Sequence, residues 1–370
     1  MARSPQSVDI EDALAPGAFD ALIDARSPAE FAEDHLPGAL NWPVLDDAER
    51  VRVGTLYTQD SPLAARKLGA ALVCRNIAIH LETQLADKPR EWRPLVYCWR
   101  GGQRSGSLAL VLSQVGFRSA QLRGGYKAFR AHVRASLETL PASLRFVVLC
   151  GRTGSGKTRL LHALRAAGAQ VLDLEGLAQH RGSVLGALPG LPQPAQRHFD
   201  SRVWKALREL DPARPVFVES ESARIGRLAV PPALLRRMHT DGKPLHLVTA
   251  DRARVALLEA DYVDGTLAPE ALCALLGGLR ALRGGARVER WQALARARQW
   301  APLITALLQE HYDPLYERSM RRSYAGLAQA PQLHVARGDA AELAALAAAL
   351  HAQEQAEAGT KSPDCPDCPA

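Results

Sequence analysis

The chain lacks several features that would place it outside the cytosol. No apolar run approaches the roughly 18 residues that a membrane-spanning helix needs. The first residues, MARSPQSVDIEDALAPG, carry acidic side chains where a secretory signal peptide has its apolar stretch. Cysteine is scarce: 6 residues at uneven spacing do not form a disulfide framework and are expected to be reduced thiols. We therefore expect a cytoplasmic protein without a membrane partner.

A metal-binding cysteine cluster is also missing from the sequence. Cys365 and Cys368 have the spacing of half a zinc site, but no second pair matches them, and they lie in a proline-rich tail. We expect no metal there. Cys74, Cys150 and Cys273 have apolar neighbours in the sequence, so we expect them in the core.

Positive charge is in modest excess. The 46 Lys and Arg residues outnumber the 39 Asp and Glu residues and leave a net charge of +7. Such a balance suits a polyanionic partner or phosphorylated substrates, although a GC-rich genome would produce the same abundance of Arg and Ala. With 47% hydrophobic and 23% charged residues, the composition excludes wholesale disorder. At about 150 residues per domain, the length predicts two domains or three.

Short apolar strands alternate with helices along the chain, which predicts parallel sheets and an α/β fold. In a first domain, 1–140, strands are predicted at 19–24, 94–97 and 120–122, and helices at 27–34, 66–86 and 105–116. The pattern restarts in a second domain, 141–350, with strands at 146–150, 170–174, 215–218 and 245–249 and an Arg- and Ala-rich helical stretch at 269–308. A last, Ala-rich helix is predicted at 340–358. We expect a disordered tail at 351–370.

The first motif that carries chemistry, CWRGGQRS at 98–105, stands between a buried strand and a helix. Cys98 is placed there at the positive end of the helix dipole with two arginines beside it, and both effects favour the nucleophilic thiolate. The glycines let successive backbone N–H groups turn inward and hold an anion. We predict that Cys98 is the nucleophile, in an anion cradle of Arg100, Gly101, Gly102, Arg104 and Ser105.

The second motif, GRTGSGKT at 151–158, is a complete G-x-x-x-x-G-K-[ST] phosphate-binding loop (P-loop). It follows a predicted strand and opens a helix, which is the context that such a loop requires. The Lys157 ammonium supplies charge to a terminal phosphate, and the Thr158 hydroxyl can hold Mg²⁺. The predicted diphosphate-binding residues are Gly151, Gly154, Ser155, Gly156, Lys157 and Thr158.

Weaker candidates surround this second motif. Glu219 and Glu221 end an apolar strand and could act at the metal edge of the phosphate site, but a solvated strand end is an equal alternative. Arg181 belongs to a loop that could cap a phosphate, and Arg224 follows the acidic strand closely enough to join it. The polar and aromatic cluster at 310–316 is explained as well by a packed helix end as by a site.

With these motifs, the sequence resembles the bacterial tRNA 2-selenouridine synthases over nearly its whole length. Its first part looks like a rhodanese domain, on the segments LIDARSPAEF at 22–31, HLPGALN at 35–41 and LRGGY at 122–126. YCWRGG at 97–102, fused to a P-loop domain, is the more specific sign. The segments at 180–183, 219–226 and 311–316 are similar to parts of the same family. The resemblance implies a rhodanese-like parallel-sheet domain followed by a P-loop NTPase-like α/β domain.

The resemblance also implies a two-step reaction on the wobble uridine of tRNAs for Lys, Glu and Gln. Geranyl diphosphate, held by the P-loop, would first geranylate the sulfur of 2-thiouridine. Selenium from selenophosphate, carried by Cys98 as an S-selanylcysteine, would then replace the geranylthio group. The partners are tRNA and a supply of selenophosphate, and the arginines between Leu279 and Arg298 are candidates for binding the RNA backbone. We expect a monomer with no tightly bound cofactor, Mg²⁺ at the P-loop being a candidate.

Three other functions fit the same residues. An ATP-dependent tRNA sulfurtransferase would use a persulfide on Cys98 and ATP at the P-loop. A cysteine phosphatase would use the C-x5-R spacing of Cys98 and Arg104, but it needs a carboxylic acid that the sequence does not reveal. A regulatory binding module would use the P-loop as a nucleotide switch and Cys98 as a redox sensor.

Overall fold

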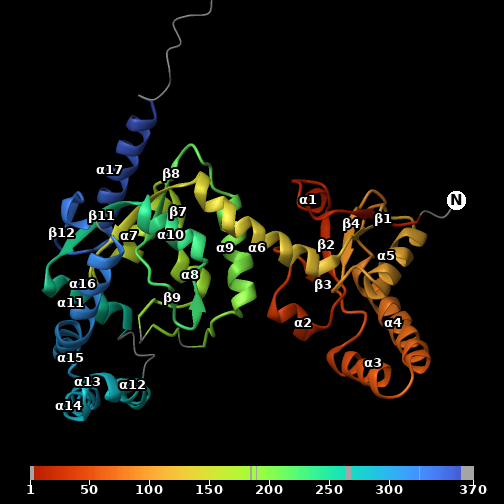
Figure 1. Cartoon of the computed structure of the whole chain (residues 1–370), viewed down its shortest axis with the longest axis horizontal. Coiled ribbons are helices and arrows are strands. Elements are labelled where there is room, and N and C mark those ends of the chain that lie inside the picture. Colours follow the sequence, from red (N-terminus) through yellow and green to blue (C-terminus); the bar gives the residue numbers. More distant parts are fainter. Residues whose placement is uncertain (1–3, 184–185, 189, 263–267, 325, 360–370) are drawn as a thin grey trace, which may run out of the picture. The chain divides into compact units, whose positions relative to one another are not determined.

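Strands and helices alternate as the sequence predicts, and the structure arranges them in two units (Figure 1). It is a computed structural model that describes residues 4–183, 186–188, 190–262, 268–324 and 326–359. The first unit comprises Met1–Leu137 and Pro194–Lys205, and the second comprises Glu138–Gln193 and Ala206–Ala370. Over these described ranges, no helix is long and apolar enough to cross a bilayer.

The first unit is built on a five-stranded parallel sheet with the order β1-β5-β4-β2-β3. Its central strand β4 (Pro94–Tyr97) is buried along its whole length, which is why its sequence is an unbroken apolar run. Strands β2 (Ala21–Asp24) and β5 (Ala120–Leu122) flank it, and β1 (Gln6–Val8) and β3 (Leu40–Asn41) form the edges. Because parallel strands end at one edge, the residues that follow β2 and β4 meet there.

Helices complete the core of the first unit. They are α1 (Ile10–Ala13), α2 (Pro28–Glu33), α3 (Asp47–Gln59), α4 (Pro62–Gln84), α5 (Gln103–Val115), most of α6 (Gly125–Ser143) and most of α9 (Gln196–Arg208). Trp42, Trp92, Val96 and Leu108 belong to one core cluster, and Cys98 packs within it. The cysteine is therefore held by the hydrophobic core itself.

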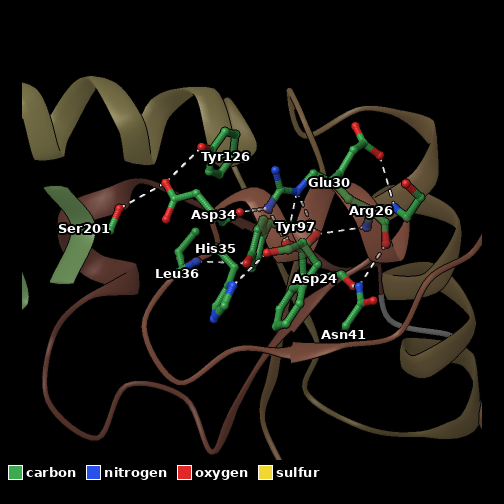
Figure 2. A network of polar contacts seen from close by, with 12 residues as sticks. Asp24, Arg26, Glu30, Asp34, His35, Leu36, Asn41, Tyr97, Tyr126 and Ser201 are labelled. Atoms are coloured by element: carbon green, nitrogen blue, oxygen red, sulfur yellow. Dashed lines mark hydrogen bonds and ion pairs between the residues drawn. The ribbon is translucent and has the colours of Figure 1, made fainter. Parts of the chain in front are cut away.

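A buried polar network ties helix α9 to the first unit (Figure 2). The Asp34 carboxylate, which is fully buried, accepts hydrogen bonds from the Tyr126 phenol at 2.9 Å and from the Ser201 hydroxyl of α9 at 3.0 Å. The buried Arg26 guanidinium donates to the Asp24 carboxylate and to the Asp34 carbonyl, both at 2.6 Å. A buried charge needs such partners, so α9 folds with the first unit although its sequence lies within the second domain.

The second unit has a five-stranded parallel sheet with the order β12-β11-β6-β8-β7. Central strand β6 (Arg145–Cys150) pairs with β8 (Pro215–Glu219) and β11 (Lys243–Thr249), and β7 (Gln170–Leu172) and β12 (Gln332–Val335) form the edges. A separate antiparallel pair joins β9 (Arg224–Ile225) to β10 (Leu228–Ala229). The carboxyl ends of β6 and β8 lie side by side, which brings the second motif next to the acidic strand end.

The helices of the second unit form two groups. Those that belong to the sheet region are α7 (Lys157–Ala166), α8 (Leu174–Ala178), α10 (Pro232–Thr240), α11 (Asp251–Tyr262), α16 (Asp313–Ser323), the 3-10 turn η2 (Leu327–Gln329) and α17 (Ala340–Gly359). A smaller helical group consists of α12 (Pro269–Gly277), α13 (Arg280–Arg283), α14 (Gly285–Arg296), α15 (Trp300–Leu307) and the π-helix η1 (Leu308–Tyr312). Trp291 is fully buried in its separate core.

The predicted α/β class with parallel sheets is confirmed, and the predicted strands 94–97 and 120–122 coincide with β4 and β5. Helix α3 was not predictable from apolar periodicity because none of its residues is buried. It is stabilised at its start by a capping box between Asp46 and Glu49. Edge strands β1, β3 and β12 are two to four residues long, too short for a period-two pattern.

Three local differences from the sequence predictions have physical reasons. Residues 140 and 141, where the predicted domains meet, both lie inside α6, which continues to Ser143. Helix α17 (Ala340–Gly359) confirms the helix predicted at 340–358, so residues 351–359 of the tail predicted to be disordered are helical. Glu354 in this part is buried and lies 3.5 Å from Arg214, and residues 360–370 lie outside the described residues. The expected core position of Cys74 is wrong, since Leu72 and Ile77 occupy the buried side of α4 and Cys74 is exposed.

Candidate active sites

Cys98 directly follows β4 and precedes the N-terminus of α5, where the helix dipole favours negative charge. Its side chain is buried, with 3% of the residue exposed. The Ser105 hydroxyl, in the first turn of α5, donates a hydrogen bond to the Cys98 sulfur at 3.1 Å. The helix N-terminus and the hydroxyl donor both favour negative charge on this sulfur, whereas its burial in an apolar core opposes it, so the nucleophilic role of Cys98 stays a prediction.

The Gly124-Gly125 turn fixes the shape of the cysteine loop. Gly125 has φ +56°, and a Cβ atom there would lie 2.2 Å from the Cys98 carbonyl oxygen, so no larger residue fits. The next two backbone N–H groups, of Tyr126 and Lys127, donate to the carbonyl oxygens of Cys98 at 2.8 Å and Trp99 at 3.0 Å. These contacts with the start of α6 therefore fix the conformation of the cysteine loop.

Gln121 of β5 holds the opposite side of the same loop. Its amide nitrogen donates to the Gly101 carbonyl at 2.8 Å, to the Gly102 carbonyl at 3.1 Å and to the Ser105 hydroxyl at 2.8 Å. Sequence reasoning missed this residue. The only available signal was a polar side chain in the middle of a three-residue apolar strand beside the cysteine strand.

The two arginines of the predicted anion cradle have different environments. Arg104 donates to the Glu30 carboxylate at 2.6 and 3.2 Å. Burial alone would raise the pKa of Glu30, but the hydrogen bond and charge of Arg104 outweigh it and lower that pKa. Arg100 is exposed on the loop. Arg104 is thus held by a carboxylate, whereas Arg100 is exposed to solvent, and the anion-binding role of both stays a prediction.

The P-loop connects β6 to α7, which begins at Lys157. Gly154 and Gly156 have φ +77° and +86°, values that favour glycine and turn the loop around its N–H groups. The Lys157 ammonium donates to the Gly151 carbonyl at 2.6 Å, and the Ser155 hydroxyl is buried without a hydrogen-bond partner among the described residues. The loop therefore has donors that a phosphate could satisfy.

Arg254 of α11, which sequence reasoning missed, holds the P-loop by hydrogen bonds to its backbone. It is 1% exposed and donates to the Thr153 carbonyl at 3.0 and 2.9 Å. It also donates to the Asp313 carboxylate at 2.9 and 2.5 Å. Asp313 belongs to the 310–316 cluster, so one part of that cluster lies at the site. The other part is a packed helix end: buried His311 accepts from Arg283 at 2.9 Å.

Three carboxylates meet beside the first turn of α7. The predicted residue Glu219 is the last residue of β8, Glu221 follows that strand, and Glu175 comes from α8. Their ligand oxygens lie within 4.8 Å of one another. Burial, followed by repulsion from a neighbouring carboxylate, raises the pKa of each to about 8. Glu175 accepts from the Thr158 hydroxyl at 3.2 Å, but neither oxygen of fully buried Glu219 has a hydrogen-bond partner in the described chain.

This oxygen-only set fits a hard divalent cation such as Mg²⁺. A buried carboxylate without a partner is costly, and a cation would satisfy Glu219 and relieve the repulsion among all three acids. Glu175 was not predicted. Its signal was the acidic pair that follows β7, the strand next to β8 in the sheet.

The remaining predicted residues belong to segments outside the cysteine loop and the P-loop. The loop that contains Arg181 lies against the carboxylates, since a Cβ atom at Gly182 would be 2.2 Å from Glu175 Oε1. Arg224 is exposed at the start of β9. In the segment 279–298, four arginines have internal partners: Arg280 with Glu289, Arg283 with His311, and Arg287 and Arg290 with Glu310. Its RNA-binding role stays a prediction.

Comparisons with known proteins cover the segments that contain both candidate sites. Residues 8–132 match the family model of the rhodanese-like domain, and residues 144–277 match that of the "tRNA 2-selenouridine synthase AAA domain". The chain is 35% identical over 325 residues to the tRNA 2-selenouridine synthase of Marinobacter nauticus, covering 80% of this chain and 87% of that protein. It is 35% identical over 346 residues to that of Cupriavidus necator, covering 84% and 91%.

Among solved structures, the N-terminal domain of a putative ATP/GTP binding protein from Clostridium difficile 630 is similar at 36% identity. It covers 35% of this chain and 98% of that chain, with a TM-score of 0.31.

Proposed function

From its membership of the tRNA 2-selenouridine synthase family, which the identity over four fifths of the chain shows, we propose that this protein replaces sulfur by selenium in the 2-thiouridine of tRNA. The reaction has two steps, each at one of the two sites, and acts on the wobble uridine of tRNAs for Lys, Glu and Gln. The observation that carries the proposal is the presence, in one chain of this family, of a core-held cysteine at a helix N-terminus and of a complete P-loop with a carboxylate cluster.

The first step is S-geranylation of 2-thiouridine by geranyl diphosphate. A thiocarbonyl sulfur is a poor leaving group, and alkylation makes C2 electrophilic and provides a thiolate that can depart. The P-loop N–H groups and Lys157 stabilise the departing diphosphate, on which negative charge develops. Among the described residues, the Lys157 ammonium donates to carbonyl oxygens of its own loop, at 2.6 Å to Gly151 and 3.4 Å to Arg152. It can exchange these neutral acceptors for a charged one.

Mg²⁺ is the proposed cofactor of this step. Thr158, Glu175, Glu219 and Glu221 would hold the ion, whose positive charge neutralises a bound diphosphate. Their raised pKa values show that the cluster carries fewer charges near neutral pH than three ordinary carboxylates would. Ion binding therefore releases protons.

The second step is selenium transfer at Cys98. The Cys98 thiolate attacks the selenium of selenophosphate to form an S-selanylcysteine, and the selenium–phosphorus bond breaks with its electron pair left on phosphorus. The terminal selenium then attacks C2 and geranylthiolate departs. A thiol reductant finally attacks the Cys98 sulfur and breaks the sulfur–selenium bond, which releases 2-selenouridine and leaves Cys98 in a mixed disulfide. Loop N–H groups and Arg100 hold the anionic donor. Arg104 contributes if the donor displaces Glu30 from its guanidinium.

The test is treatment of a 2-thiouridine anticodon-arm RNA with geranyl diphosphate and selenophosphate, read by nucleoside mass spectrometry. Cys98→Ser is expected to accumulate S-geranyl-2-thiouridine, whereas Lys157→Ala yields neither product, because it lacks the charge that stabilises diphosphate. Cys74→Ser, at an exposed cysteine without a placed role, is the matched control and behaves as wild type. Normal selenouridine formation by Cys98→Ser contradicts the role of Cys98. A requirement for ATP would favour the sulfurtransferase function instead.

A further inference from the structure

The P-loop has an aromatic neighbour that the proposed function has not used. Tyr316 of α16 places its ring centroid 5.8 Å from the Lys157 ammonium. The phenol oxygen is buried and has no hydrogen-bond partner among the described residues. Burial raises the pKa of this phenol above its ordinary value, so the side chain is neutral at physiological pH. A large, neutral, polarisable face thus stands beside the charge that binds phosphate.

The fold holds Tyr316 at that position through Asp313, three residues earlier on the same helix. Asp313 accepts from Arg254, and Arg254 also donates to the Thr153 carbonyl of the P-loop. The start of α16 is therefore anchored to the loop by one buried guanidinium. Residues three apart share a helix face, so an anchor at Asp313 directs Tyr316 to the same side.

A second local feature marks this helix start. Residues Leu308–Tyr312 form a π-helical turn immediately before α16. Such turns are rare and occur often at functional sites, where they change the direction of the side chains that follow. Here the change of phase separates buried His311, which pairs with Arg283, from Asp313 and Tyr316 at the P-loop.

We propose that the face of the Tyr316 ring contacts the first carbon of the prenyl chain of an allylic diphosphate bound at the P-loop and stabilises the positive charge that develops on it. This inference rests on the proposed geranylation. An ammonium–oxygen hydrogen bond takes about 2.8 Å, so a phosphate oxygen bound to Lys157 and the carbon bonded to that oxygen fit within reach of a ring at 5.8 Å. Aromatic faces attract cations within about 6 Å.

The step divides charge between two side chains. The sulfur of 2-thiouridine donates a lone pair to the first prenyl carbon, and the carbon–oxygen bond breaks with its electron pair left on the diphosphate. The uridine N3 proton is released to solvent, so the alkylated base is neutral. Lys157 stabilises the negative diphosphate while Tyr316 stabilises the allylic carbon, and each interaction strengthens only as the bond breaks.

The experiment measures geranylation of the RNA by the full-length protein with Tyr316→Phe, Tyr316→Leu and a series of ring-fluorinated phenylalanines at 316. We expect Phe to keep kcat within about threefold and Leu to lower it by about thirtyfold, the size of a desolvated cation–aromatic contact. Each added fluorine withdraws electrons from the ring face, so log kcat should fall steadily along the series. The Kd for inorganic diphosphate should remain within about twofold. Tyr57→Leu, at an exposed tyrosine, is the control.

Three outcomes decide between this role and its alternatives. A kcat that does not respond to fluorination overturns the proposal, even if Leu impairs folding, because the fluorinated rings keep the packing. A fall in activity with Phe as large as with Leu also overturns it, since the hydroxyl would then act. If the wild-type protein forms selenouridine without any geranylated product, the proposed function has failed first, and the role of Tyr316 fails with it.

Discussion

The cysteine loop and the P-loop differ in how completely the protein itself satisfies their polar groups. Around Cys98, the Ser105 hydroxyl donates a hydrogen bond to the sulfur, the Gln121 amide donates to the loop carbonyls, and Glu30 pairs with Arg104. Buried polar atoms that lack a hydrogen-bond partner in the described chain occur instead in the unit that holds the P-loop. Those of Ser155, Glu219 and Tyr316 belong to the P-loop or its neighbours, and the others are on His180, Ser220, His239, Trp291, His311 and Tyr324. Since buried polar groups are nearly always paired, the unpaired atoms at the P-loop support the proposal that this region binds a ligand.

The same difference is seen in the charges. The pKa of Glu30 is lowered, because Arg104 outweighs the effect of burial, whereas burial and mutual repulsion raise the pKa of Glu219 to about 8. The first carboxylate is paired within the fold, whereas the second has no such partner among the described residues, which is where the proposed cation would bind. A carrier cysteine can work in a preformed cradle, but a site that binds and releases diphosphate cannot carry permanent internal partners for its donors.

Each loop accepts hydrogen bonds from a side chain outside it, Gln121 for the cysteine loop and Arg254 for the P-loop, and removal of the charged one is expected to have the largest effect. Arg254→Ala leaves Asp313 without its main partner and the Thr153 carbonyl without its donors. Breaking one partner of a buried ion pair costs about 3–5 kcal/mol. We expect that loss in the second unit, measured by denaturant-dependent hydrogen exchange of β6 and α7 peptides, together with loss of geranylation.

Arg252→Ala is the matched control, because Arg252 lies on the same helix and is exposed. The double variant Arg254→Met with Asp313→Leu removes the charges together and should recover most of the stability but not the geranylation. If Arg254→Ala lowers the free energy of unfolding by less than about 1 kcal/mol, the Arg254 ion pair contributes no more than an exposed salt bridge and does not hold the loop in place.

The opposite pKa shifts predict opposite pH dependences for the two units. In the folded second unit the carboxyls keep their protons up to about pH 8, whereas unfolded glutamate releases them near 4.5, so stability falls as pH rises between those values. The contribution of Glu30 has the other sign: it is present above its ordinary value of 4.5 and lost as pH falls through the lowered pKa. Hydrogen exchange of β8 and α2 peptides, corrected for intrinsic rates, resolves the two.

Added Mg²⁺ is expected to stabilise the second unit and to leave the first unchanged. Added ion should restore protection of β8 at pH 8, by about 2.7 kcal/mol at a hundredfold excess over Kd, and should leave α2 unchanged. Glu219→Gln should reduce both the loss of protection at high pH and the response to Mg²⁺, while Glu138→Gln, at an exposed carboxylate, changes neither. A β8 segment whose stability is independent of pH and Mg²⁺ would refute the cation site.

Much of each site could be predicted from sequence because strand, loop and helix lie in order within one short segment. The segments 98–105 and 151–158 are of this kind, and the structure places both at strand ends that precede helix N-termini. Glu219 and Glu221 were found for the same reason. The α/β class followed from the unbroken apolar character of β4 and β6, which are buried central strands.

The residues that sequence reasoning missed act across long chain separations. Glu175, Arg254 and Gln121 become functional neighbours only when the sheet order and helix placement are known. Helix α9 is the clearest case: Ser201 pairs with Asp34, 167 positions away, and so joins the first unit. No periodicity or motif in the sequence around Ser201 indicates this contact, because its partner, the buried Asp34 carboxylate, lies in a distant part of the chain.

Replacement of Gln121, the uncharged side chain that holds the cysteine loop, is expected to have the smallest effect on activity. Gln121→Ala leaves the Gly101 carbonyl and the Ser105 hydroxyl without their shared donor, at a cost of about 1 kcal/mol. The Gly124-Gly125 turn still fixes the other side of the loop, so Cys98 should keep its place with a looser cradle. We expect selenium transfer to slow by about threefold to tenfold, as 1 kcal/mol is a factor of about five, while geranylation is unchanged. Gln84→Ala, at an exposed glutamine, is the control, and nucleoside mass spectrometry gives both rates. Slowing of both steps alike would show that the two loops do not work independently.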